Sequence, residues 1–144
     1  TFNLQSSIAN LPATLTLVAE RVQLLRYGEN PHQQAALYRW AGAGLAFEQI
    51  QGKELSYDNL VDLEAAWAMP QEFAEPTVAI IKHTNPSGLA SAETLLEAYR
   101  LAFACDPVSA YGSIIAVNRE VDLALSPRLV ISANSEMIEY SPVL

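Results

Sequence analysis

The chain has 144 residues and is acidic, with 16 Asp and Glu residues against 8 Lys and Arg residues and a net charge of -8. This length predicts a single domain, and an apolar fraction of 51% is enough to bury a core. The charge argues against a nucleic-acid surface, and no apolar run reaches the roughly 20 residues of a membrane span, so we expect neither nucleic acid nor membrane as a partner.

The first third of the chain predicts strands. Residues 14–25 begin with alternating apolar side chains and predict a strand. A turn-forming stretch, RYGENPHQ at 26–33, follows it. Segments 35–40 and 45–51 predict two further strands, and the small residues AGAG between them favour a hairpin.

Residues 58–73 carry the clearest helical pattern, with apolar side chains at helical spacing. Asp58 is placed to cap the N-terminus, and Asp62 and Glu64 in the first half suit the helix dipole. Pro70 lies late in the pattern, so we expect the regular helix to stop or kink just before it.

Residues 77–82, TVAIIK, are apolar at odd and even positions alike, which is typical of a strand covered on both faces. Residues 91–104 predict a second helix with Ser91 as its cap, and 113–118, SIIAVN, predict another strand of the same kind. The order strand, helix, strand predicts a right-handed βαβ unit with a parallel strand pair.

The last part of the chain has a weaker pattern. Residues 128–132, RLVIS, predict a short strand, and residues 136–140 predict one turn of helix. Pro127 and Pro142 limit the length of either element.

The single cysteine, Cys105, excludes a disulfide within the chain, and with only two histidines we expect no metal site. The first ten residues, TFNLQSSIAN, lack the basic start and apolar core of a signal peptide, and the missing initiator Met suggests a processed or excised piece. These features together predict a cytoplasmic protein.

The stretch KHTNPSG places Lys82 and His83 at the end of the buried strand 77–82, and the residues that follow, 84–88, predict a turn that begins at Asn85-Pro86. The carboxyl ends of strands in α/β sheets are where ligands bind, so this pair predicts a functional site. The alternative is structural, with Lys82 as a charged strand end and His83 as a hydrogen-bonded loop histidine.

Three further stretches carry polar side chains in turn-rich surroundings. LRYGENPHQ contains Arg26, whose guanidinium suits a phosphate or carboxylate. QGKELSYDNLVD places Asn59 in the first turn of a helix, and CDPVSAYGS contains Gly112, which lets a ligand approach the backbone. Each stretch alone is also compatible with an ordinary loop or a capped helix start.

Taken together and in this order, four segments resemble the transformylase region of the AICAR transformylase/IMP cyclohydrolase family: LRYGENPHQQAALY, GKELSYDNLVDLEAAW, VAIIKHTNPSGLA and ACDPVSAYGSIIAVNREVD. The match covers roughly residues 12–122. The resemblance implies an α/β fold with a cytidine-deaminase-like layered sheet and helices, of which this chain is the first half of a duplicated region. The zinc signature of the deaminases is absent from the sequence.

The resemblance implies transfer of a formyl group from 10-formyltetrahydrofolate, a co-substrate, to the amino group of the AICAR ribonucleotide. It also implies a homodimer with sites at the subunit interface. The family's catalytic pair matches Lys82, which would stabilise the oxyanion, and His83, which would act as general base. The family's nucleotide contacts match four further residues, namely Arg26 and Tyr27 at the phosphate and Asn59 and Gly112 along the pocket.

The chain also departs from the family. The family's transformylase region is more than twice as long and follows a cyclohydrolase domain, and the tail from Leu123 diverges from the expected continuation. Three interpretations stay open. The chain is an excised or truncated piece of the enzyme, a short product that needs a partner chain to complete its site, or a non-catalytic nucleotide-binding or self-associating remnant. The first predicts exposed apolar surface where the missing half would dock.

Overall fold

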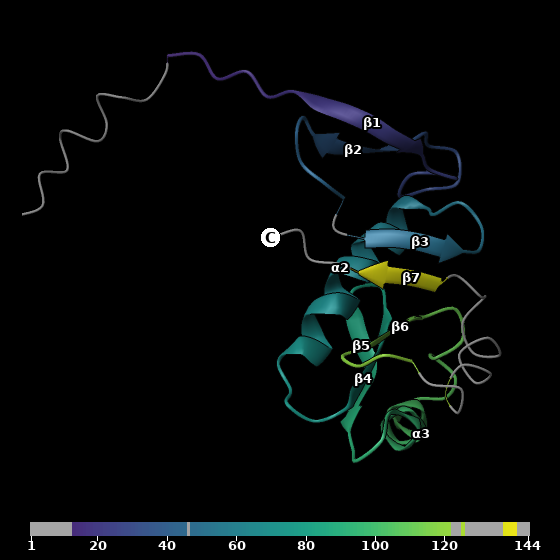
Figure 1. Cartoon of the computed structure of the whole chain (residues 1–144). Helices are drawn as coiled ribbons and strands as arrows, with labels where there is room; N and C mark the ends of the chain where they lie inside the picture. Colours follow the sequence, from purple (N-terminus) through teal and green to yellow (C-terminus); the bar gives the residue numbers. More distant parts are fainter. Residues whose placement is uncertain (1–12, 46, 122–124, 126–136, 141–144) are drawn as a thin grey trace, which may run out of the picture.

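The computed structural model describes residues 13–45, 47–121, 125 and 137–140. These residues form a mixed α/β structure (Figure 1), as the sequence predicted at that level. In chain order the elements are β1 (Ala19–Leu24), β2 (Ala36–Trp40), β3 (Phe47–Gln51), α2 (Tyr57–Gln71), β4 (Thr77–Lys82), β5 (Asn85–Ser91), α3 (Leu95–Cys105), β6 (Ile114–Val117) and β7 (Met137–Tyr140).

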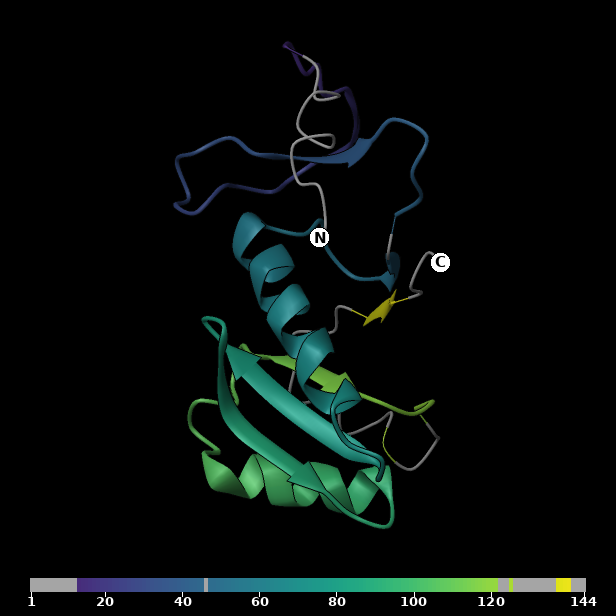
Figure 2. The ribbon, with the colours of Figure 1, turned by 90° about the vertical axis from the view of Figure 1, so that its left-hand side faces the viewer.

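The centre of the fold is a three-stranded sheet of order β5–β4–β6, with α2 on one face and α3 on the other (Figures 1 and 2). Side chains of β4 alternate between the two faces, as the pleat of a strand requires. Val78 and Ile80 pack in the core on the α3 side, whereas Ala79 and Ile81 pack with Ala66 of α2. The prediction that this strand is covered on both faces is therefore confirmed.

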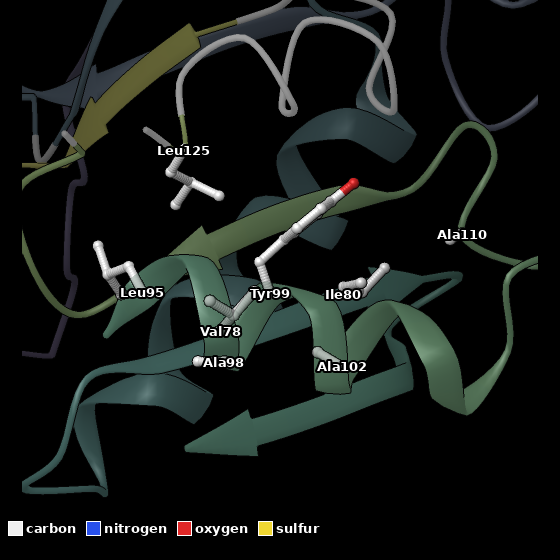
Figure 3. Close-up of a cluster of buried hydrophobic side chains, with 8 residues drawn as sticks. All are labelled: Val78, Ile80, Leu95, Ala98, Tyr99, Ala102, Ala110 and Leu125. Atoms are coloured by element: carbon white, nitrogen blue, oxygen red, sulfur yellow. The ribbon is translucent and has the colours of Figure 1, made fainter. Parts of the chain in front are cut away.

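The larger of the two cores lies between the sheet and α3 (Figure 3). Tyr99 from α3 and the strand residues Val78 and Ile80 lie at its centre, and Leu125 closes it from the tail of the chain. This double coverage holds the sheet between two helices.

The predicted parallel pair is wrong, because β4 pairs antiparallel with both β5 and β6. Residues 84–88, TNPSG, predict a turn, yet all but the first of them belong to strand β5, which follows a turn of only two residues. The chain then reverses into α3 and again into β6, so β6 returns antiparallel to β4. Strands β5 and β6 run in the same direction on either side of β4, which makes β5–α3–β6 a split βαβ unit.

Pro86 is tolerated in β5 because β5 is an edge strand and the register with β4 shifts at that point. A proline lacks the N–H that a central strand must donate, and it is found on edges and at bulges. The Asn85-Pro86 pair therefore marks the start of a bulged edge strand and not the turn that we expected from it.

Both helix caps differ from the prediction. Ser56, not Asp58, caps α2, and it forms a capping box with Asn59, whose side chain accepts a hydrogen bond from the Ser56 N–H. Thr94, not Ser91, caps α3, because Ser91 is the last residue of β5. Helix α2 continues through Pro70 to Gln71, since a proline in the last turn removes only one intrahelical hydrogen bond.

The predicted hairpin between 35–40 and 45–51 is also wrong. β2 pairs antiparallel with β1, which begins at Ala19 and is shorter than predicted, and β3 pairs with β7. The turn between β1 and β2 is closed by backbone hydrogen bonds, including Leu25 N to Ala35 O at 2.9 Å and Gly28 N to Gln33 O at 3.0 Å. These hydrogen bonds close the loop of residues 25–35, so β2 lies beside β1.

The β1–β2 ribbon exposes large apolar side chains. Leu24, Tyr38 and Trp40 are 62%, 56% and 59% exposed. The strand register places these residues on one face, because Tyr38 and Trp40 are two residues apart and Leu24 pairs with Ala36. A two-stranded ribbon is marginally stable by itself, and large apolar side chains gathered on one exposed face are uncommon on a surface that meets only water.

In the tail, the helical turn predicted at 136–140 is wrong, because residues 137–140 form β7 and pair with β3. The strand predicted at 128–132 lies outside the described residues. Along the ranges that the structure covers, neither helix combines the length and apolar character that would be needed to cross a bilayer.

Candidate functional site

The turn between β4 and β5 carries His83. Lys82 pairs with Asn85, so His83 and Thr84 are the two residues of the turn, with φ angles of 52° and 62°. Two-residue hairpins with both central φ angles positive favour Asn and Gly, and a β-branched residue such as Thr rarely adopts this conformation. Holding a non-glycine residue there costs on the order of 1–3 kcal/mol, so neighbouring groups must stabilise the turn.

Three short hydrogen bonds hold this turn. The Thr84 N–H donates to Oδ1 of Asp62 at 2.7 Å, across from α2. The Thr84 hydroxyl and the Asn85 amide both donate to the His83 carbonyl oxygen at 2.7 Å. The carboxylate of Asp62 thus links the second turn of α2 to the strained residues. From the sequence pattern we expected Asp62 only to suit the helix dipole, since no local feature indicates its contact with Thr84.

Lys82 and Gly112 come together although they lie on different elements. The Lys82 ammonium donates to the carbonyl oxygen of Tyr111 at 3.0 Å, next to Gly112 in the loop that leads into β6. Gly112 has a φ of +74°, and a Cβ added there would meet nothing within 4 Å. The backbone around Gly112 is therefore open beside the Lys82 ammonium.

Asp106 organises the loop that carries Tyr111 and Gly112. Its carboxylate accepts the N–H groups of Val108 at 3.2 Å and Ser109 at 3.0 Å, and its carbonyl oxygen accepts the Ala110 N–H at 3.1 Å. Hydrogen bonds from the Ser109 side chain and backbone lower the pKa of Asp106 below its usual 3.8, with a smaller contribution from the Lys82 charge. The loop beside Lys82 is thus fastened by an ionised carboxylate.

We expect Asp106 to make the stability of the chain depend on pH at the acid end. Because its folded pKa is lowered, its contribution is fully present above the unfolded value near 3.8 and is lost as the pH falls through the folded pKa. Urea unfolding between pH 2 and 6 should show a shallower loss of stability on acidification for Asp106→Asn than for the wild type. An NMR titration that places the Asp106 carboxyl at or above 3.8 would contradict this expectation.

Arg26, Tyr27 and Asn59 form a second cluster. Nη2 of Arg26 lies 3.4 Å from Oδ1 of Asn59 and 3.5 Å from the Tyr27 hydroxyl, and its Cζ lies 5.1 Å from the centroid of the Tyr27 ring. The backbone is anchored on both sides, because Arg26 N donates to Leu55 O at 2.9 Å and Tyr57 N donates to Tyr27 O at 3.1 Å. The β1–β2 turn is therefore fixed against the N-terminus of α2.

Helix α2 connects the two clusters. Asn59 and Asp62 are three residues apart and lie on the same helix face. Asn59 contacts Arg26, and Asp62 contacts the turn at Thr84. In Figure 2 the β1–β2 turn, the end of β4 and the loop into β6 all lie on the left of the view.

All six residues singled out by sequence analysis therefore belong to two clusters at one end of the central sheet: Arg26, Tyr27 and Asn59 in one, and Lys82, His83 and Gly112 in the other. The functional groups that these residues bring to the two clusters are a guanidinium with a phenol in one, and an exposed imidazole and an ammonium in the other. Across the ranges that the structure describes, no group of three or more His, Cys, Asp or Glu residues is arranged as metal ligands.

Comparison with known proteins places these clusters in a family. The family described as AICARFT/IMPCHase bienzyme matches residues 1–139. A protein of Desulfitobacterium hafniense (strain DSM 10664 / DCB-2) named bifunctional purine biosynthesis protein PurH is 59% identical over 123 residues, which is 83% of this chain and 24% of that protein. The protein of the same name from Rhodospirillum rubrum is 53% identical over 117 residues, 77% of this chain and 22% of that protein.

The chain thus spans about a quarter of the length of the curated relatives it matches, with 24% and 22% coverage. The matched region includes both residue clusters and the whole central sheet. The family model matches most of the chain, and more than half of the aligned residues are identical in each of these relatives. The chain belongs to the AICARFT/IMPCHase bienzyme family.

Proposed function

We propose that the chain acts in purine biosynthesis as part of an AICAR transformylase, in which a formyl group passes from 10-formyltetrahydrofolate to the amino group of the AICAR ribonucleotide. The relatives' name, bifunctional purine biosynthesis protein, and the family description support this role. The observation that carries it is the joining of two residue clusters, one with Arg26 and one with His83, through a single face of α2.

In this proposal His83 is the general base. The amine nitrogen of the nucleotide attacks the formyl carbon, and the imidazole, acting as general base, takes the amine proton. The carbon–nitrogen bond to the folate then breaks, and tetrahydrofolate leaves with a proton. The exposed position of His83 in a two-residue turn gives its ring access to a bound substrate.

Lys82 stabilises the negative charge that develops on the formyl oxygen. An ammonium carries three hydrogen-bond donors, and the Tyr111 carbonyl accepts one of them at 3.0 Å. This contact fixes the side chain, and the other N–H groups of the ammonium can donate to the oxyanion. Their stabilisation of the oxyanion is stronger in a site from which water is excluded. Gly112, next in the chain, lets the nucleotide lie close to the backbone.

Arg26 holds the phosphate of the nucleotide, with Tyr27 beside it. A planar guanidinium binds phosphate through two parallel hydrogen bonds, and Oδ1 of Asn59 orients it. Because the chain has a net charge of -8, attraction of a phosphate must come from such local donors.

The finer architecture is part of the same proposal. The sheet covered by α2 and α3 suits a cytidine-deaminase-like layering, and the exposed apolar face of the β1–β2 ribbon suits a homodimer or the rest of the enzyme as partner. The remaining folate and nucleotide contacts then come from that partner. A cytoplasmic location completes the proposal, since the pathway's substrates are small and soluble.

Calorimetric titration with AICAR ribonucleotide tests the nucleotide site. Arg26→Ala should weaken binding about 30-fold, since a charge-assisted contact is worth about 2 kcal/mol. Arg39→Ala is the matched control, because the Arg39 guanidinium on β2 pairs with Glu20 of β1 at 3.0 Å, and we expect this variant to bind as the wild type does. Absence of heat with the wild type, or equal affinity for Arg26→Ala, would remove the nucleotide-site proposal.

A turnover assay with 10-formyltetrahydrofolate separates the enzyme from a non-catalytic binder. Formyl transfer that disappears in His83→Ala supports catalysis by this chain. Because the proposal takes the remaining contacts from a partner, nucleotide binding without turnover is expected of a fragment of the enzyme that is not active alone. Only turnover that is lost in His83→Ala excludes the alternative of a non-catalytic nucleotide-binding or self-associating remnant.

A further inference from the structure

We propose that Asp62 is a positioning residue, which holds the left-handed His83–Thr84 turn and sets its place relative to the Arg26–Asn59 pair. Its meaning for catalysis rests on the function proposed above. The structural part of the inference stands on the hydrogen bond from the Thr84 N–H to Asp62 Oδ1.

The turn needs an external support. Its φ angles of 52° and 62° are adopted here by His and Thr, neither of which relieves the contact between Cβ and the backbone as glycine does. The hydrogen bonds from the Thr84 hydroxyl and the Asn85 amide end on the His83 carbonyl, within the turn itself. The Asp62 carboxylate is the contact that comes to Thr84 from another element.

Asp62 is suited to this role by distance and charge. At 2.7 Å, the contact between its Oδ1 and the Thr84 nitrogen has the short length of a hydrogen bond to an ionised acceptor. The helix dipole does not account for Asp62, because α2 begins at Tyr57 and the effect of the dipole fades within the first turn. Asp58, in that first turn, fills the dipole role.

The same helix face carries the phosphate-side contact. Asn59 lies three residues before Asp62 and accepts from Arg26 at 3.4 Å. A rigid helix between the two contacts therefore sets the separation of the imidazole-bearing turn from the guanidinium. Loss of the Asp62 contact should release the turn while leaving the Arg26 cluster in place.

Amide hydrogen exchange of the whole chain, followed by NMR, tests the hold on the turn. In Asp62→Ala the Thr84 amide should exchange at least tenfold faster, and the ring resonances of His83 should shift. Asp62→Asn keeps an acceptor oxygen and should restore most of the protection and the ring resonances. The amide of Ile80 in β4 should exchange equally in all variants, which separates a local effect from unfolding.

Glu64→Gln is the matched control, since Glu64 is exposed on the same helix two residues further on, and it should exchange as the wild type does at Thr84. Unchanged Thr84 exchange and His83 resonances in Asp62→Ala would overturn the inference. So would an equal acceleration at Ile80, because the role would then be general stability.

AICAR calorimetry on the same variants connects the turn to the proposed function. Asp62→Ala should weaken binding several-fold, and the double variant with His83→Ala should bind no more weakly than His83→Ala alone. Wild-type chain that fails to bind AICAR counts against the proposed function, while the exchange experiment still decides the role of Asp62. Additive losses in the double variant would contradict an action through the turn.

Discussion

Replacing Gly88 with alanine should destabilise the chain by about 3 kcal/mol, because it forces the backbones of β5 and α3 apart. Gly88 is buried in β5 opposite Ile80. A Cβ at this position would overlap the carbonyl oxygen of Ala102 in α3 and lie 2.8 Å from its carbonyl carbon. These are backbone atoms of a helix, so no side-chain rotation relieves the overlap. The requirement for glycine here arises from close packing, since Gly88 has no positive φ.

Gly42→Ala provides a matched control for the loss of a glycine. Gly42 has a φ of +83° and nothing within 4 Å of an added Cβ, so it should cost only about 1 kcal/mol, for backbone conformation alone. Urea denaturation should show a lower midpoint for Gly88→Ala than for Gly42→Ala, with similar slopes. Equal midpoints would show that β5 and α3 separate at little cost.

Replacing Asn118 with alanine should cost about 3 kcal/mol, because one side chain satisfies the backbone on both sides of the α2–β4 connection. Its Nδ2 lies within 3.0 Å of the carbonyl oxygens of Pro70 and Phe73 and within 2.9 Å of that of Glu75. Its Oδ1 accepts the N–H of buried Thr77 at 2.8 Å. Without the amide, the Thr77 N–H and the Phe73 carbonyl oxygen lose this partner, whereas the carbonyl oxygens of Pro70 and Glu75 keep hydrogen bonds from the Phe73 N–H and the Thr77 hydroxyl.

Asn118→Asp is the sharper test of this account. It keeps the acceptor for Thr77 but replaces the donor with a carboxylate oxygen among carbonyl oxygens, so it should destabilise at least as much as alanine at pH 7. Glu120→Gln, at an exposed site two residues after Asn118, should stay within about 0.5 kcal/mol of the wild type. A neutral Asn118→Asp variant in thermal unfolding would contradict the proposed hydrogen bonding.

Local sequence pattern was sufficient to predict α2, β4, α3 and β6. Each of these elements has an apolar period that belongs to one backbone conformation, and β4 shows apolar residues on both parities because helices cover both of its faces. The segment of β5 was hidden because Asn85, Pro86 and Gly88 are turn formers in isolation. Only its edge position and its packing against α3 make a strand of it.

Strand partners could not be predicted from the same patterns. The pairing of β3 with β7 joins residues 47–51 to residues 137–140, and no local feature of either segment specifies the other. The pairing of β1 with β2 depends on the hydrogen bonds within the loop of residues 25–35 that joins them. Pairing is a property of the assembled chain, since the strand backbone accepts any neighbour whose side chains fit its face.

By itself, the sequence determined the positions of Arg26, Lys82 and His83 in motifs of one family. Each motif is a short run of consecutive residues, so it can be recognised without knowledge of the tertiary structure. Tertiary structure alone decided how these motifs meet. Asn59 and Asp62 become neighbours on a helix face, and that face reaches Arg26 and Thr84 only after α2 packs against the sheet. Packing brings segments that are distant in the sequence within hydrogen-bond range, and no local sequence pattern indicates which segments will become neighbours in space.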